Sequence, residues 1–390
     1  MPQRTTVTIL SPTLSSNPVG RTHVLVELLE DRFDVQVIGF DVPGALWPPL
    51  QGADFRAESV FAKGIAGFLL RAAREAARKV RGQVLYCVKP RLTSYGLGLL
   101  LRRSLRLPLI LDIDDWERGF LVPSPYWEMR HFKTAWIRSP ESPLYTRLLD
   151  GHTSAANAVT VSNAFLQGMY GGTWIPHARN EALFTPGPMP LRPSVTFLGT
   201  PRDHKGIQDL LTAWRQMGTS HAILRLIGFG EAHPASLESD PTIEVRGSVG
   251  IREVPALLNQ TSIVVVPQRN ARASLGQLPA KLMDAIAMGR AVVATDVGDA
   301  HRWLSDGAGI CVPPGDVDAL ARALRDLITT PSRTESYGAA ARQRFLEFGS
   351  FAAVRPRLHA LVDCVLAGSE VPPPVAAFTS AARVRPLPAY

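Results

Sequence analysis

Two series of alternating strand and helix patterns, separated by a proline-rich stretch, most constrain the fold of this chain. Residues 176–193 hold five prolines and little periodicity. Because strands that alternate with helices form parallel sheets with helices on both faces, we expect two doubly wound α/β units. The strand candidates before the stretch are Val7–Leu10, Val35–Ile38, Val84–Val88, Leu109–Ile113 and Ala158–Ser162, and those after it are Val195–Leu198, Ile223–Ile227, Ile243–Gly247, Ile263–Val266 and Ala291–Ala294.

The length of 390 residues also favours two domains. We predict a Rossmann-like domain over residues 1–178, a linker over 179–193 and a second Rossmann-like domain over 194–340. We predict a helical segment over residues 341–368, with Pro356 as a candidate interruption. This segment is also a candidate for packing back on the first domain. Residues 369–390 are rich in Pro, Ala, Val and Arg without periodicity, which predicts a disordered tail.

Composition excludes several classes of protein. No run of about 18 residues is apolar and uncharged, so we expect no membrane-spanning helix. The first apolar run, Val7–Leu10, is too short for a signal peptide. The three cysteines, Cys87, Cys311 and Cys364, show no paired spacing, which predicts a reducing cytoplasm and no metal ligation.

The net charge of +8 favours polyanionic partners or surfaces, although a general preference for arginine would give the same excess. Residues Ala62–Arg81 combine an apolar trio, Phe68 to Leu70, with the basic residues Arg71, Arg74, Arg78, Lys79 and Arg81. They predict either a basic amphipathic helix on anionic lipid, at the inner face of the membrane, or an ordinary solvated helix.

A strand-to-helix loop with basic residues opens the second unit. Phe197–Gly206 leaves one predicted strand and enters the next helix, and it carries Arg202 and Lys205. Free backbone N–H groups and a partial positive charge at a helix N-terminus attract anions. The loop therefore suits a diphosphate; a solvated charged loop is the alternative.

A second motif couples a lysine to a carboxylate. In Leu278–Thr295, Pro279 suits a first helical turn, and Lys281 and Asp284 then share one helix face. An inward-pointing carboxylate at a helix start can accept hydrogen bonds from two neighbouring ribose hydroxyls. The alternative is a surface ion pair.

The first unit has an acidic stretch, Asp112–Glu117, which begins at the carboxyl end of a predicted strand. It is either an Asp-x-Asp metal site or the rim of a ligand cleft at the carboxyl end of a strand; the two-unit organisation favours the rim. The aromatic residues from Trp116 to Trp136 suit sugar stacking or the packing of a long loop.

These motifs together resemble family 4 of the retaining glycosyltransferases, which have the two-domain GT-B architecture. That family reads roughly G-R-x-x-x-x-K-G and then E-A-M-A-x-G-x-P-V-V-A. The resemblance covers most of residues 1–330 and is carried by Gly199–Gly206, Asp284–Ala294, Asp306–Asp316 with Ala319–Leu324, Ala158–Leu166 and Trp174–Pro186.

Four positions depart from the family pattern, one of them Asp299 in Gly298-Asp299, where the family has a glycine pair after the last strand. Thr200 replaces an arginine, whose role Arg202 could take from the same loop. Gly276 stands where the first of two acidic residues is usual, and Asp284 is shorter than the common Glu. The form Pro279-Ala-Lys281-Leu-Met-Asp284 resembles a subset with P-x-K-x-x-E.

The resemblance implies a metal-independent hexosyltransferase without a cofactor, which moves a sugar from a nucleotide-diphosphate sugar to a hydroxyl of a glycan, lipid-linked or small-molecule acceptor. It implies no nucleic-acid partner. A nucleotide-sugar epimerase and a catalytically inactive subunit are the alternatives. The expected catalytic residues are Arg202, Lys205 and Asp115, and the expected donor-binding residues are Gly20, Gly199, Lys205, Gly228, Leu278, Pro279, Lys281 and Asp284.

Overall fold

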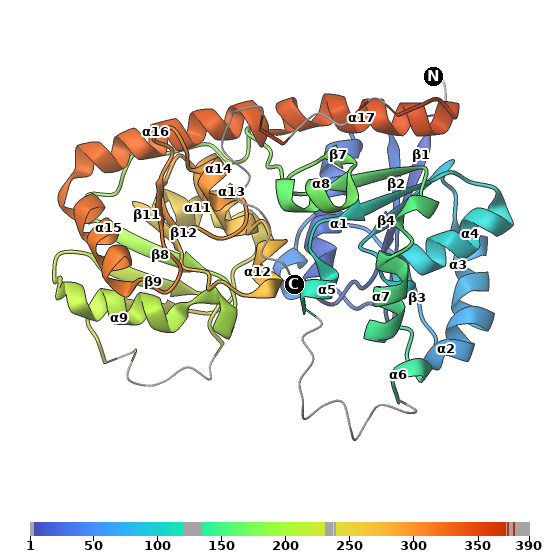
Figure 1. Cartoon of the computed structure of the whole chain (residues 1–390), viewed down its shortest axis with the longest axis horizontal. Coiled ribbons are helices and arrows are strands. Elements are labelled where there is room, and N and C mark those ends of the chain that lie inside the picture. The colour runs from blue at the N-terminus through green and yellow to red at the C-terminus, as the bar shows by residue number, and fades with distance from the viewer. Residues whose placement is uncertain are drawn as a thin grey trace.

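Two parallel sheets lie side by side in the computed structural model, which describes residues 4–120, 135–230, 237, 239–371, 373 and 377–378 (Figure 1). The first sheet has seven strands in the order β3-β2-β1-β4-β5-β6-β7, and the second has six in the order β10-β9-β8-β11-β12-β13. The predicted pair of doubly wound parallel sheets is therefore confirmed. In each sheet the strand order changes direction at one point, between β1 and β4 in the first sheet and between β8 and β11 in the second. Ligands of α/β sheets bind at such switch points.

The strands are short and mostly buried. Their bounds are β1 Thr6–Ser11, β2 Asp34–Phe40, β3 Glu58–Val60, β4 Val84–Val88, β5 Leu109–Ile113, β6 Ala158–Val161, β7 Thr173–Trp174, β8 Ser194–Leu198, β9 Ile223–Ile227, β10 Ile243–Arg246, β11 Ile263–Val266, β12 Ala291–Thr295 and β13 Ile310–Val312.

The helices connect these strands. Their bounds are α1 Pro18–Leu29, α2 Gly64–Gly67, α3 Ala73–Lys79, α4 Leu97–Leu105, α5 Glu117–Phe120, α6 Ala135–Arg138, α7 Pro143–Asp150, α8 Ala164–Tyr170, α9 Ile207–Met217, α11 Val254–Asn259, α12 Arg272–Leu275, α13 Ala280–Ala287, α14 Ala300–Trp303, α15 Val317–Thr329, α16 Pro331–Phe348 and α17 Phe351–Ala367. Short 3-10 turns lie at Pro48–Leu50, Thr153–Ala155, Asp203–Lys205 and Ile251–Glu253, and π-helical turns at Phe68–Ala72 and Leu92–Gly96.

Side chains that alternate along the strands build one core on each face of each sheet. In the first sheet, Val7 and Ile9 pack with α1 and α17, whereas Leu10 and Leu85 pack with α3 and α4. In the second sheet, one face packs with α9 and α15 and the other with α11, α13, α14 and α16. A strand covered on both faces is apolar throughout, which explains the continuous Val, Ile and Leu runs.

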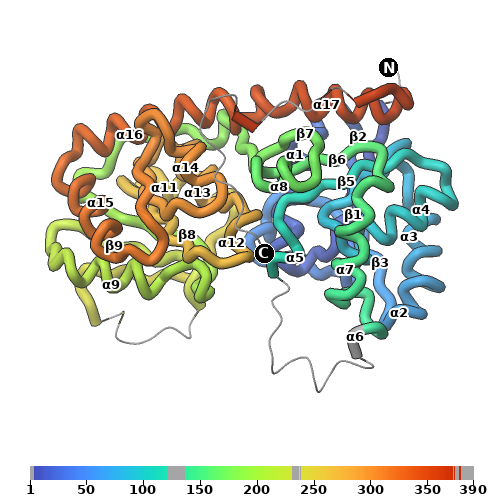
Figure 2. The backbone as a smooth tube through the Cα atoms, in the orientation of Figure 1, coloured from blue at the N-terminus to red at the C-terminus, as the bar shows by residue number. Residues whose placement is uncertain are grey.

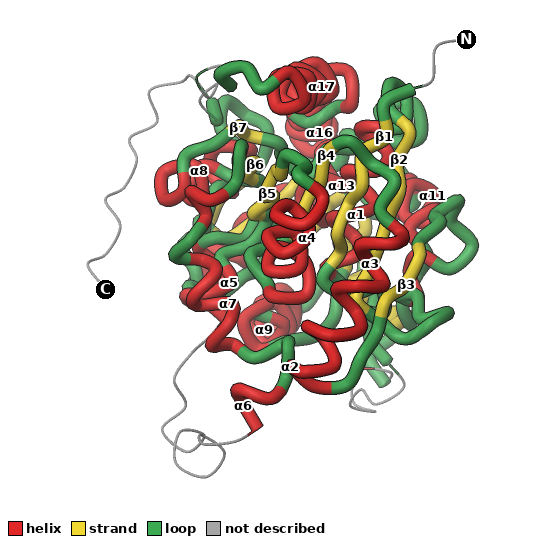
Figure 3. Tube along the Cα trace, turned by 90° about the vertical axis from the view of Figure 1, so that its right-hand side faces the viewer, coloured by secondary structure: helices red, strands yellow, loops and turns green. Residues whose placement is uncertain are grey.

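Helices α16 and α17 connect the two halves of the molecule. They run in succession along the same side of both sheets, α16 over the second sheet and α17 over the first (Figure 2). Figure 3 turns the first half toward the viewer, with α17 end on and α2, α3 and α4 on the outer side. The chain returns from the second half to the first at Gly349, and Ser350 caps α17 by accepting a hydrogen bond from the N–H of Ala353.

Two residues of the predicted tail are packed. Phe378 is 8% exposed, and its ring centroid lies 4.9 Å from that of Trp174 in β7 and 5.1 Å from that of Trp303 in α14. Its neighbour Ala377 donates a backbone hydrogen bond to Gln167 and accepts one from Arg302. Most of the remaining tail lies outside the described residues.

The predicted basic helix over Ala62–Arg81 is built in three pieces, α2, the π-helical turn and α3. Phe68 is fully buried, whereas Leu69 and Leu70 are 47% and 57% exposed. Arg71, Arg74 and Arg78 are exposed beside them. None of the described helices is both long and apolar enough to cross a membrane.

Candidate functional site

A cavity of about 470 Å³ lies between the two halves, at the carboxyl ends of both sheets. Its walls come from the loops that follow β1, β5, β8, β9, β10 and β11 and from the starts of α1, α11 and α13. The cavity brings together every site residue predicted from the sequence, namely Gly20, Asp115, Gly199, Arg202, Lys205, Gly228, Leu278, Pro279, Lys281 and Asp284. Their roles stay predictions.

The loop between β8 and α9 carries Lys205 to the cavity. Gly206 ends this loop with φ +68°, and a Cβ atom there would lie 1.7 Å from the carbonyl oxygen of Pro267, so only glycine fits. Gly199 and Gly228 also have positive φ and approach each other closely. Lys205 donates a hydrogen bond to Oε1 of Gln277 at 2.8 Å.

Burial lowers the pKa of Lys205 to about 8, and the charges of Arg202 and Lys281 act in the same direction. Asp115 opposes them. The ammonium group is therefore held at a site that lacks enough negative charge to compensate it, which is the electrostatic condition for binding an anion.

Helix α13 presents a buried carboxylate. Asp284 is 3% exposed, and its Oδ1 accepts a hydrogen bond from Nε of Arg179 at 2.6 Å. Its Oδ2 lies 3.7 Å from Nζ of Lys281. Pro279 stands just before the helix and, together with Leu278, lines the cavity. Because each carboxylate oxygen has two lone pairs, Asp284 keeps acceptor capacity for a ligand.

The first half contributes the start of α1, including Gly20, and a buried ion pair behind it. Nε and Nη2 of Arg21 donate to both oxygens of Asp112, at 2.9 and 2.7 Å. The two side chains are 1% and 0% exposed. This fork fixes α1 to the end of β5, so the rim of the cavity is rigid here.

The acidic stretch after β5 surrounds a buried lysine. Nζ of Lys89 lies 2.8, 2.6 and 3.0 Å from carboxylate oxygens of Asp114, Asp115 and Glu117. Burial alone would lower the pKa of Lys89, but these carboxylates raise it well above its usual value. Burial raises the pKa of Asp114 to about 7. Burial would also raise the pKa of Asp115, but Lys89 overrides this and holds it below its usual value.

The carboxylates of the Asp-x-Asp pattern are therefore already paired with protein cations, Asp112 with Arg21 and Asp114 with Lys89. In the part of the chain that the structure describes, no group of three or more His, Cys, Asp or Glu side chains is arranged to hold a metal ion. Of the aromatic stretch, Trp116 is packed at 8% exposure; residues 121–134 lie outside the described part.

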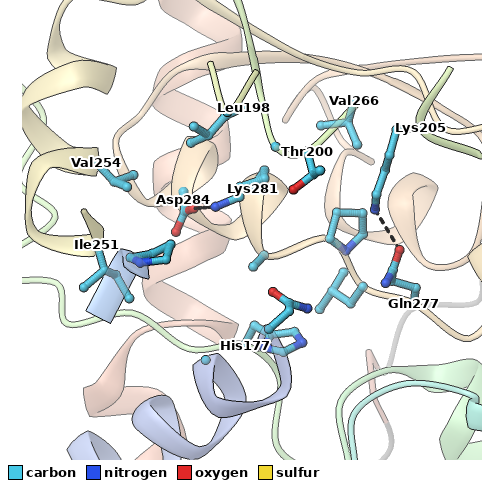
Figure 4. Close-up of a pocket in the computed structure, with 18 of the residues that line it drawn as sticks. His177, Leu198, Thr200, Lys205, Ile251, Val254, Val266, Gln277, Lys281 and Asp284 are labelled. Carbon is cyan, nitrogen blue, oxygen red and sulfur yellow. Dashed lines mark hydrogen bonds and ion pairs between the residues drawn. The ribbon is translucent and has the colours of Figure 1, made fainter. Parts of the chain in front are cut away.

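Trp116 also explains the glycine at 276. A Cβ atom on Gly276 would lie 2.3 Å from Cβ of Trp116, so no acidic side chain fits at this position while the two halves are in contact. The Gly276 carbonyl accepts a hydrogen bond from Nδ2 of Asn163 at 3.1 Å. The next residue, Gln277, faces the cavity instead (Figure 4).

Sequence reasoning missed the apolar residues Ile251 and Val254 and three polar residues of the site: His177, Arg179 and Gln277. His177 lines the cavity from the crossover between the sheets, and burial, then Arg21 and Arg179, hold its pKa well below the usual value. It is therefore neutral at pH 7. His177 could have been identified from the motif Trp174–His177, whereas no local sequence pattern indicates Arg179 or Gln277.

The lining has a clear order along the cavity. In Figure 4, apolar Ile251 and Val254 lie on one side, Asp284 and Lys281 in the middle, and Thr200, then Lys205 with Gln277, on the other side. An apolar slot, a carboxylate and a cationic end thus follow one another.

Comparison with known proteins matches residues 192–330 to the family described as "Glycosyl transferases group 1". A curated relative, alpha-maltose-1-phosphate synthase of Mycolicibacterium smegmatis, is 25% identical over 181 residues. That match spans 42% of this chain and 46% of the relative, so less than half of the relative's length is covered.

Two solved structures are similar over nearly the whole chain. Sucrose-phosphate synthase from Thermosynechococcus elongatus gives a TM-score of 0.72 at 15% identity, covering 94% of this chain and 100% of that one. HepE from Anabaena, solved in complex with UDP-glucose, gives 0.70 at 16% identity, covering 92% and 99%. Both likenesses concern the fold.

Proposed function

We propose that this chain, whose residues 192–330 belong to the group 1 glycosyl transferases, moves a sugar from a nucleoside diphosphate sugar to an acceptor hydroxyl. The transfer retains the anomeric configuration and uses no metal ion. A hexose is the expected sugar, and the HepE complex with UDP-glucose makes a uridine nucleotide the first donor to test.

The order of the cavity lining carries the proposal. A nucleoside diphosphate sugar is itself a series of a flat apolar base, a ribose with two hydroxyls, a dianionic diphosphate and a polar sugar. The slot at Ile251 and Val254 suits the base, Asp284 the ribose, and Lys281 and Lys205 the diphosphate. The sugar then falls beside Gln277 and the rim at Asp115.

Breaking the glycosidic bond leaves extra negative charge on the departing diphosphate. Lys205, Arg202 and the first turn of α13 all face the cavity and would stabilise that charge. The low pKa of Lys205 fits this role, because a phosphate neighbour favours its charged form.

The acceptor hydroxyl enters from the first half, between the start of α1 at Gly20 and the carboxylate of Asp115. Asp115 is ionised, since Lys89 holds its pKa low. His177 is neutral and so offers hydrogen bonds but no charge. Closure of the two halves about residues 176–193 would exclude water, which competes with the acceptor.

The exposed leucines and arginines of residues 62–81 support peripheral contact with an anionic membrane, which would suit a lipid-linked acceptor. Leu69 and Leu70 would enter the interface while Arg71 and Arg74 meet the headgroups. Flotation with vesicles of phosphatidylglycerol should recover the protein, and Leu69→Asp with Leu70→Asp should release it. Equal recovery of both proteins would refute the contact.

Donor binding is tested by thermal shift with UDP, GDP, dTDP and ADP sugars, because a bound ligand raises the melting temperature. No shift with any of them would refute the proposed site. The ribose contact is tested with UDP against 2′-deoxy-UDP. We expect the wild type to prefer UDP and Asp284→Asn to lose that preference.

Product analysis separates the alternatives of another class. Slow hydrolysis or transfer of the sugar supports a transferase, whereas a free changed sugar supports an epimerase. Binding without any turnover supports an inactive subunit, for which the missing acid at Gly276 is the motivating observation.

A further inference from the structure

One polar side chain at the cationic end of the cavity contacts both halves of the molecule. Oε1 of Gln277 accepts a hydrogen bond from Nζ of Lys205 at 2.8 Å, and Nε2 of Gln277 lies 3.4 Å from Oδ1 of Asp115, to which it donates. Gln268 also donates to Oε1, at 3.1 Å. The amide of Gln277 therefore connects the cation of the second half to a carboxylate of the first.

The backbone that carries Gln277 is held by the first half as well. Asn163 donates to the carbonyl of Gly276, and Trp116 fills the space next to its Cα. On the far side, Lys89 holds Oδ2 of Asp115 at 2.6 Å. Gln277 thus stands between two fixed groups, so its own position depends on how the two halves sit together.

An amide is the side chain that suits this place. It accepts from an ammonium group with its oxygen and donates to a carboxylate with its nitrogen. A carboxylate at 277 would pair with Lys205 and repel Asp115, and an aliphatic side chain would lose both contacts. Being neutral, the amide holds Lys205 without compensating its charge, which stays available for a phosphate.

We propose that Gln277 is a positioning residue that aims the ammonium group of Lys205 at the donor diphosphate and links this aim to the first half through Asp115. The proposal rests on the proposed function. Through Gln277, contact between the two halves is coupled to the orientation of Lys205 for binding the donor.

The charged groups that face Lys205 come from three elements. Arg202 lies in its own loop, Lys281 on α13, and Asp115 at the end of β5. In the free protein, the ammonium form of Lys205 is lost as the pH rises through about 8. Since a bound diphosphate favours the ammonium form, affinity is highest below that pH and falls above it, by about tenfold per pH unit at most.

The test compares Gln277→Leu and Gln277→Glu with the wild type by titration calorimetry with UDP, GDP and ADP from pH 6.5 to 9.5. We expect Gln277→Leu to weaken binding about ten- to a hundredfold, because Lys205 loses its acceptor. In Gln277→Leu, the decrease in nucleotide affinity with rising pH should begin at a lower pH than in the wild type. Gln277→Glu should also weaken binding, because its carboxylate competes for Lys205, but its fall should begin at higher pH.

Opposite shifts of the two profiles separate positioning from a merely structural role, which would weaken binding equally at every pH. The same exchanges at Gln216, exposed on α9, serve as the matched control and should change neither quantity. Parallel profiles for all proteins would overturn the role of Gln277 while the proposed function stands.

A ligand-free readout keeps the two proposals distinguishable. The NMR titration of ¹³C-dimethylated Lys205 should show a higher pKa in Gln277→Glu and a lower one in Gln277→Leu. An unchanged titration overturns the contact itself. If the titration shifts but no nucleotide binds the wild type, the proposed function fails, and with it the donor role of Gln277.

Discussion

The ion pair between Arg179 and Asp284 joins the crossover between the sheets to α13, and its strength can be measured. The side chains are 9% and 4% exposed, and Nε lies 2.6 Å from Oδ1. Removing one member of a buried pair leaves an uncompensated charge, which typically costs about 3–5 kcal/mol. Because Nη1 of Arg179 also donates to the carbonyls of His177 and Ala178, we expect the lower end for Asp284→Leu, about 3 kcal/mol.

For a domain of about 150–250 residues, a loss of about 3 kcal/mol lowers the melting temperature by about 6–12 °C. The double variant Arg179→Met with Asp284→Leu has no buried charge at either position, and it should regain most of the loss. Calorimetry of the four proteins without ligand gives the coupling between the two sites, and it does so independently of any contact with ribose.

The exposed pair of Arg269 and Asp209 provides a control in the same half. Its atoms lie 2.8 Å apart, but the side chains are 46% and 18% exposed. We expect Arg269→Met to cost less than about 1 kcal/mol. The reasoning is refuted if Asp284→Leu melts within a degree of the wild type, or if the double variant is as unstable as the sum of the single ones.

Three further outcomes are expected. Gly206→Ala should unfold at lower denaturant concentration and lose nucleotide affinity, because its Cβ would collide with the carbonyl of Pro267. The control is Gly218→Ala, which has a similar φ but open space around it; it should lower the free energy of unfolding by only about 1 kcal/mol. Phe378→Ala should destabilise by about 3 kcal/mol, since a buried ring is lost; an unchanged denaturation midpoint would contradict its packing. Lys205→Ala should slow turnover by orders of magnitude and remove the fall in nucleotide affinity above pH 8; a near-normal rate would contradict its assignment.

The fold could be predicted largely because buried parallel strands are continuous apolar runs. Strands without such a run were missed: β3 and β13 have three residues each and β7 only two. The expected interruption at Pro356 also differs from the structure, in which α17 continues through this residue. The break falls at Gly349 instead, where Ser350 supplies the cap for α17.

The site could be predicted only where its chemistry is local. Lys205 and Asp284 each belong to one strand-to-helix motif, so a short stretch of sequence identified them. The partner of Asp284, Arg179, is 105 residues away, and Gln277 contacts Asp115 across 162 residues. Such pairs depend on how the two halves of the molecule pack together, and a local sequence pattern cannot predict that.

The placement of α17 has a consequence for how the protein is made. Its side chains complete the same core as Val7 and Ile9 in β1, and its His359 hydrogen-bonds the carbonyl of Leu28 across 331 residues. On a ribosome, the first sheet therefore emerges early but leaves one face partly uncovered until the second half has been synthesised. Chains stalled before α17 should carry that apolar face in the open, as substrates for chaperones and proteases.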